Sequence, residues 1–176
     1  IDTCGQWTTR EDINEEEFSA WRQLLQGTRR LRSTPALNGV LICVDCLELK
    51  NALWEERKRL ADALRSRLAE VHMAHGRPAQ VYIALTGLDK LDGAASLLGL
   101  MTPAQWSKGI GFALPFDGPD NRTNDIRSGL EQALSDLEHR VQQQAMFAAP
   151  GADNTAVNEL QLKFVESLGE LHSPIL

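Results

Sequence analysis

Two short polar clusters each follow an apolar stretch, and the residue types in them suit phosphate chemistry. The first, "DTCG", places Asp2 and Gly5 three residues apart, directly after Ile1, which we expect to end a strand. In phosphoryl-transfer proteins an aspartate at such a strand end holds magnesium, and the glycine offers its backbone N–H to the γ-phosphate. Aspartate and glycine are also common turn residues, so an ordinary turn is the alternative interpretation. The magnesium role of Asp2 requires a bound nucleotide.

The second cluster, "TGLD", follows the apolar run "VYIAL". Its Asp89 has the acceptors to bind a guanine edge, with Thr86 closing the strand, as in guanine-nucleotide proteins. Those proteins carry a lysine directly after the asparagine or threonine, and its stem covers the base. Gly87 occupies that position here, and Lys90 comes three residues later. The cluster therefore predicts a base-recognition site that lacks one of its parts.

A phosphate cradle is missing from the printed chain. The pattern G-x-x-x-x-G-K-[ST] does not occur, and the glycines of "TGLDKLDG" and "KGIGFALPF" do not have its spacing. We therefore predict that this segment binds nucleotide weakly or not at all, needs no cofactor and is not itself an active enzyme. Because the chain starts at Ile1 rather than at methionine, we expect a longer parent protein. GTP or ATP with magnesium would then belong to that full-length protein.

Cysteine and histidine pairs offer weaker chemistry. Cys43 and Cys46 form a C-x-x-C, but a zinc site needs further ligands at similar spacing. A redox pair remains an alternative, although Cys43 lies inside an apolar run and is expected to pack as a small hydrophobic residue. His72 and His75 stand one helical turn apart, and the sequence identifies no third metal ligand.

Composition restricts the classes of partner. The chain has 176 residues, 43% hydrophobic and 24% charged, which are values of a globular domain. A net charge of −6 argues against a nucleic-acid partner, and the basic run Arg29–Arg32 is interpreted as the solvated end of a helix. No apolar stretch reaches the roughly 18 residues of a membrane span, so we expect the segment itself to be soluble.

The polar clusters must be positioned by alternating strands and helices. Apolar spacing predicts an α/β fold, in which a parallel sheet is flanked by helices and ligands bind at the carboxyl ends of the strands. Asp2 and Asp89 should then face a common cleft. The expected elements are a helix over Glu15–Arg32, a strand in "NGVLICVD", a helix over Leu53–His75 ended by Gly76 and Pro78, strands over Gln80–Thr86 and Gly109–Phe116, a helix from Asn124 or Asp125, and a final helix over Val157–Leu171.

The expected division into domains follows from these elements. Residues 1–145 are predicted to form the α/β domain without its phosphate loop, and residues 146–176 a linker and a C-terminal amphipathic helix. The apolar stripe of that helix either docks on its own sheet or waits for a neighbouring domain. A sheet that lacks its upstream central strand has open edges, which favour self-association.

Four stretches in order carry a family resemblance: "PALNGVLICVDCLEL", "RLADALRSRLAEVH", "PAQVYIALTGLDKLDG" and "QWSKGIGFALPF". From Ile1 to about Phe116 the chain resembles the cytoplasmic domain of the TssM (IcmF) family, inner-membrane proteins of type VI secretion systems. The resemblance implies a P-loop NTPase-like (GTPase-like) fold, incomplete here at its N-terminus. It also implies that the full-length protein is membrane-anchored, with this segment on the cytoplasmic face of the bacterial inner membrane.

The resemblance also assigns residues and partners. Asp2 and Gly5 match the magnesium and γ-phosphate motif, with Cys4 where alanine is usual; Thr86 and Asp89 match the base motif, from which Gly87 departs. The implied partners are the membrane-complex proteins TssL and TssJ and baseplate proteins such as TssK. We expect a scaffold that links the two assemblies. The alternative is an NTP-hydrolysing switch whose phosphate loop lies upstream.

Overall fold

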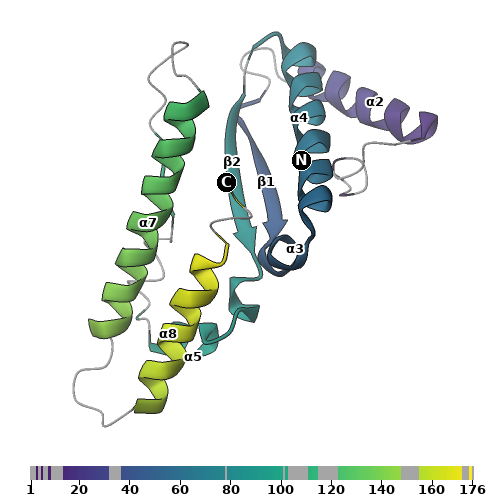
Figure 1. Cartoon of the computed structure of the whole chain (residues 1–176). Helices are drawn as coiled ribbons and strands as arrows, with labels where there is room; N and C mark the ends of the chain where they lie inside the picture. Colours follow the sequence, from purple (N-terminus) through teal and green to yellow (C-terminus); the bar gives the residue numbers. More distant parts are fainter. Residues whose placement is uncertain are drawn as a thin grey trace. The chain divides into compact units, whose positions relative to one another are not determined.

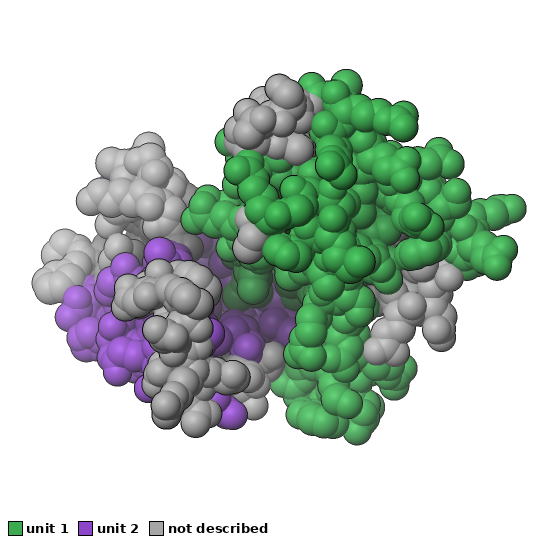
Figure 2. Space-filling view, turned by 90° about the horizontal axis from the view of Figure 1, so that it is seen from above, with its two compact units in different colours: residues 1–44, 51–86 green, residues 45–50, 87–176 purple. Residues whose placement is uncertain are grey.

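The computed structural model describes residues 3, 5, 8, 14–31, 37–77, 79–100, 102, 111–114, 123–147, 155–171 and 175. The chain divides into two units, one made of residues 1–44 and 51–86 and the other of residues 45–50 and 87–176 (Figure 2). Because the two units are not placed relative to one another, each is described separately.

A two-stranded parallel sheet lies at the centre of the first unit. Strands β1 (Gly39–Asp45) and β2 (Gln80–Thr86) run in the same direction and are connected through α3 (Cys46–Asn51) and α4 (Trp54–His75) (Figure 1). The predictions of these two strands and of the long helix between them are confirmed. Helix α4 ends at Gly76, whose φ of 70° is left-handed and whose N–H donates to the His72 carbonyl at 2.8 Å; glycine adopts this conformation at low cost.

Helix α2 (Glu15–Leu31) packs on α4 and builds the core of the first unit. Its start is a capping box, in which the Glu17 N–H donates to Asn14 Oδ1 at 2.8 Å and the Asn14 N–H donates to Glu17 Oε2 at 3.2 Å. The predicted helix is thus confirmed within one residue at its end. The residues that bury its apolar face are Trp21, Leu25 and Val71, with Leu24, Leu37, Val40 and Ala74 packed around them.

Polar contacts add to this helix pair. The Trp21 indole Nε1 donates to Glu70 Oε2 at 2.6 Å, and the same carboxylate oxygen lies 3.1 Å from Arg67 Nη1. Farther along, Thr28 Oγ1 lies 3.3 Å from His75 Nε2. Burial lowers the pKa of His75, and the positive charges of nearby arginines lower it further. Helix α2 is therefore fixed to α4 both by apolar packing and by hydrogen bonds.

Helices make up most of the described part of the second unit. They are α3, a short 3₁₀ turn η1 (Leu88–Lys90), α5 (Ala94–Leu100), α7 (Thr123–Phe147) and α8 (Thr155–Gly169). Helix α8 packs against α5 and α7, and its buried side chains are Phe164, Val165, Ser167 and Leu168. The predicted helices near Asn124 and in the C-terminal part are confirmed. The described members of the predicted stripe, Phe164, Leu168 and Leu171, are buried, and α8 packs against helices α5 and α7. The short elements α3, η1 and α5 were not predicted.

The third predicted strand is not present where the structure can test it. Gly111–Leu114 have no strand pairing, and the other residues of Gly109–Phe116 lie outside the described part, as does Ile1. Glycine and proline in this stretch weaken its preference for a strand. The Gly111 carbonyl instead accepts a hydrogen bond from Arg140 Nη2 of α7 at 3.1 Å. None of the described helices is long and apolar enough to cross a membrane.

Candidate functional site

Three of the four predicted site residues lie in the described part of the chain, and one does not. Asp2 lies outside the described residues, so its magnesium role and its predicted cleft with Asp89 stay predictions. Gly5 is an exposed helical residue, and its carbonyl accepts a hydrogen bond from Thr8 Oγ1 at 3.0 Å. Thr86 ends β2, and its hydroxyl donates to the Val44 carbonyl at 3.3 Å. Asp89 is exposed in the turn η1.

An ion pair that was not predicted joins the last residue of β1 to the turn η1 that follows β2. Lys90 Nζ is 2.8 Å from Asp45 Oδ2. The other carboxylate oxygen of Asp45 accepts the N–H groups of Leu47 at 2.8 Å and Glu48 at 3.3 Å. Asp45 thus caps the start of α3 and binds the only lysine of the loop after β2. The signal for Asp45 was in the sequence, since an aspartate ends an apolar run directly before a helical stretch.

Gly87 explains why this loop departs from the lysine of the base motif. Its φ is 72°, in the left-handed region that side chains other than glycine seldom adopt. A Cβ at this position would lie 3.1 Å from Asp45 Oδ2 and 3.3 Å from Lys90 Nζ. A lysine at position 87 would therefore be strained and would press on the ion pair. The one ammonium group of the loop is bound to Asp45.

The charges at this site follow from these contacts. The hydrogen bond from Lys90 lowers the pKa of Asp45, and the N–H groups of Glu48 and Leu47 lower it further. The same hydrogen bond raises the pKa of Lys90. Both groups are therefore held in their charged forms at neutral pH.

Of the two cysteines in the C-x-x-C, Cys46 does not have the surroundings of a reactive thiol. Both thiols are free; Cys46 is buried and Cys43 is exposed. Burial raises the pKa of Cys46, and the negative charge of Asp45 adds to the effect, so its nucleophilic thiolate is disfavoured. The prediction that Cys43 packs as a small hydrophobic residue is wrong. Side chains alternate along β1, and Cys43 lies on the same exposed side as Leu41.

Metal binding also lacks a full set of ligands in the described residues. No three histidine, cysteine, aspartate or glutamate residues among them are grouped to hold an ion. His72 is exposed, while His75 is half-buried against Thr28. The interpretation of these two histidines as metal ligands therefore has no third ligand in the part of the chain that the structure describes.

One polar cavity of about 390 Å³ lies in the second unit. It contains the ion pair between Lys50 Nζ and Glu170 Oε2, which are 2.5 Å apart. Two lysines and three acidic residues leave the lining without an excess of positive charge that would select an anion. The lining residues are Lys50, Asp92, Gly93, Lys163, Glu166, Ser167 and Glu170.

Removing the charge of Asp45 should give a stability difference that depends on pH. The pKa of Asp45 is lowered on folding, so its contribution is present above the ordinary carboxyl pKa and is lost as pH falls through the lowered value. The pKa of Lys90 is raised, so its contribution is lost only as pH rises through that raised value. Asp45→Asn should therefore lower Tm most between about pH 5 and 9, and little near pH 2. Asparagine keeps the oxygen that caps α3, which isolates the charge effect.

Thermal unfolding of both chains, followed by circular dichroism across this pH range, measures the difference. Asp62→Asn is a matched control, because Asp62 Oδ1 lies 3.4 Å from Nη1 of the largely exposed Arg65. This substitution should change Tm little at any pH in the range. A loss of Tm in Asp45→Asn that is constant from acid to neutral pH would contradict the ion-pair explanation.

Comparisons with known proteins place these features in a family. Residues 14–176 match the family model described as the IcmF-related N-terminal domain. The chain is also similar to the type VI secretion system component TssM1 of Pseudomonas aeruginosa (strain PAO1), with 26% identity over 151 residues. That alignment covers 82% of this chain and 14% of TssM1, so the chain spans a small part of this relative. No solved structure matches the chain.

Proposed function

Because the chain belongs to the family of IcmF-related N-terminal domains, we propose that it is a segment of a type VI secretion system component. The family match over residues 14–176 is the observation that carries this proposal, and the likeness to TssM1 supports it. Its proposed location is the cytoplasmic face of the bacterial inner membrane, with the membrane anchor elsewhere in the full-length protein.

Within that system the proposed role is a scaffold that links the inner-membrane complex, with TssL and TssJ, to baseplate proteins such as TssK. The loop after β2 supports a structural role. Gly87 stands in place of a base-covering lysine, and Lys90 binds Asp45 at 2.8 Å. An ammonium group paired at so exposed a site adds little to stability, but its charge is already balanced by a carboxylate.

The second candidate is an NTP-hydrolysing switch with a P-loop NTPase-like fold. It is favoured by Thr86, the last residue of β2, and by Asp89, three residues later, which have the spacing of a base-recognition motif. In that proposal the phosphate loop comes from an upstream part of the parent protein. Asp2 would hold magnesium and Gly5 would contact the γ-phosphate of the bound nucleotide.

A titration with two kinds of ligand tests the proposal. Purified chain is titrated in a calorimeter with TssK, and separately with GTP and ATP in the presence of magnesium. We expect saturable binding of TssK and no saturable nucleotide binding in the micromolar range, because the sequence contains no phosphate cradle. Asp89→Asn should leave both results unchanged.

Two outcomes would contradict the scaffold proposal. Absence of TssK binding by this chain and by the full-length protein would remove its proposed partner. Micromolar, magnesium-dependent nucleotide binding that Asp89→Asn abolishes would favour the switch instead.

A further inference from the structure

One end of the first unit carries positive charge without any acidic residue in its chain segments. The chain has 24 aspartates and glutamates, yet none occurs between residues 18 and 44 or between residues 71 and 88. These two stretches contain five arginines and two histidines, namely Arg22, Arg29, Arg30, Arg32, Arg77, His72 and His75. For a chain with a net charge of −6, this is a marked separation of charge.

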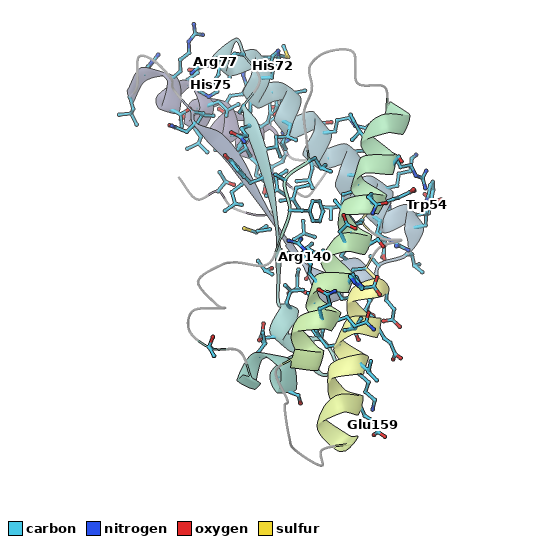
Figure 3. The ribbon with its side chains drawn as sticks, turned by 90° about the vertical axis from the view of Figure 1, so that its left-hand side faces the viewer. Trp54, His72, His75, Arg77, Arg140 and Glu159 are labelled. Atoms are coloured by element: carbon cyan, nitrogen blue, oxygen red, sulfur yellow. The ribbon has the colours of Figure 1, made fainter. Side chains whose placement is uncertain are left out.

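The fold brings the two stretches together at the ends of α2 and α4. Thr28 Oγ1 lies 3.3 Å from His75 Nε2, and Arg29 Nη1 lies 3.4 Å from the Ala74 carbonyl. Figure 3 shows His72, His75 and Arg77 at this same end. Within the described residues, neither Arg30 nor Arg77 has an ion pair.

Within the part of the first unit that the structure describes, no carboxylate forms an ion pair with the arginines of this end. The first one back along α4 is Glu70, and its Oε2 already accepts the Trp21 indole N–H and lies 3.1 Å from Arg67. The two helix C-termini supply only about half a negative charge each. The described residues of this end therefore carry a net positive charge.

Two apolar side chains project beside the cations. Leu31, at the end of α2, is 81% exposed, and Met73, in the last turn of α4, is 79% exposed. Exposed apolar side chains flanked by arginines are typical of surfaces that bind the headgroup region of a membrane. The apolar groups enter the interface while the cations contact anionic headgroups.

We propose that the cationic end, defined as Arg29, Arg30, Leu31, His72, Met73 and Arg77, docks on an anionic phospholipid surface. Lipid fits better than nucleic acid, because projecting leucine and methionine side chains have no use on a phosphate backbone. Lipid also fits better than an acidic protein, because Leu31 and Met73 are 81% and 79% exposed, as are apolar side chains that insert among headgroups. The inference is drawn from charge and exposure, so it stands apart from the secretion role.

Vesicle co-sedimentation of the 176-residue chain tests this proposal. We expect binding to phosphatidylcholine vesicles that contain about 30% phosphatidylglycerol, and none to phosphatidylcholine alone. Binding should fall strongly in about 0.5 M NaCl, because salt screens the attraction. The double variant Arg30→Glu/Arg77→Glu should lower the partition coefficient at least about 30-fold, since each cation near the surface contributes a factor of about five.

A matched control tests whether the change in net charge alone, rather than its position, accounts for the loss of vesicle binding. Arg59→Glu/Lys163→Glu reverses two exposed cations outside the cationic end and changes the net charge equally. This control should retain most of the binding, whereas Leu31→Ser/Met73→Ser should lose binding at unchanged charge. Circular dichroism establishes that all variants are folded.

The proposal would be overturned by an absence of binding of the parent chain to anionic vesicles, by equal binding to neutral vesicles, or by equal losses in the Arg30/Arg77 and Arg59/Lys163 variants. Capture of an acidic protein through this end without any vesicle binding would also overturn it, in favour of a protein partner.

Discussion

Replacing Trp21 by alanine is expected to lower the free energy of unfolding by about 3–5 kcal/mol. The side chain is only 5% exposed and packs with Leu25 and Val71, where α2 meets α4. Its indole N–H also donates to Glu70 Oε2 at 2.6 Å. The substitution leaves a cavity and removes a hydrogen bond to a carboxylate that already faces the buried Arg67. Both losses weaken the packing of α2 against α4.

Two further variants separate the contribution of apolar packing from that of the hydrogen bond. Trp21→Phe keeps most of the apolar contact but loses the hydrogen bond, and should cost about 1.5–3 kcal/mol. Trp54→Ala is the control, because Trp54 is 64% exposed, and should change stability by no more than about 0.5 kcal/mol. Urea unfolding followed by far-ultraviolet circular dichroism measures all three variants. Equal losses for Trp21→Ala and Trp54→Ala would show that α2 is not packed as described.

Gly39→Ala should destabilise the strand pair by about 1–3 kcal/mol. A Cβ at this position would lie 2.8 Å from Tyr82 Cε2 and 2.9 Å from the Gln80 carbonyl oxygen. The ring can rotate away, but the carbonyl belongs to β2 and cannot move without changing the strand pairing. This close approach gives a physical reason for the glycine in "LNGV".

The control for Gly39 lies in a helix. At Gly27 of α2 an alanine Cβ would meet no atom within 4 Å beyond its own helix backbone, so Gly27→Ala should be neutral or stabilise by up to about 1 kcal/mol. Adding Tyr82→Ala to Gly39→Ala should not restore stability, because the contact with the Gln80 carbonyl remains. Thermal unfolding of the three variants gives the comparison, and a stable Gly39→Ala chain would contradict the described pairing.

Long periodic segments were the predictable part of this fold. The apolar spacing predicted that α2 and α4 are helices, and the unbroken apolar runs of β1 and β2 match two parallel strands. It predicted the buried face only in part, since the buried residues of α4 are Ala63, Arg67 and Val71. Short elements such as α3 and α5 have too few turns for a periodic signal to emerge. Near Gly111 a strand was predicted where the described residues have none, since an apolar run by itself does not establish strand pairing.

The candidate site was predictable only in part. The rule that ligand residues lie at the carboxyl ends of parallel strands led to Thr86 and Asp89, whose role in nucleotide binding stays a prediction, and the same rule applied to β1 would have led to Asp45. The pairing of Asp45 with Lys90 depends on the left-handed backbone at Gly87, which sequence spacing does not reveal. The opposite exposure of Cys43 and Cys46 likewise depends on where the strand ends and the helix begins.

The carboxylate of Asp45 joins two loops that are 40 residues or more apart in sequence, since it caps α3 and holds Lys90 at the same time. A displacement of the segment after β1 must therefore either drag η1 with it or rupture this junction. Because the side chains of this ion pair are 53% and 25% exposed, it links the two segments only weakly, and a modest pull on either segment would be enough to separate them.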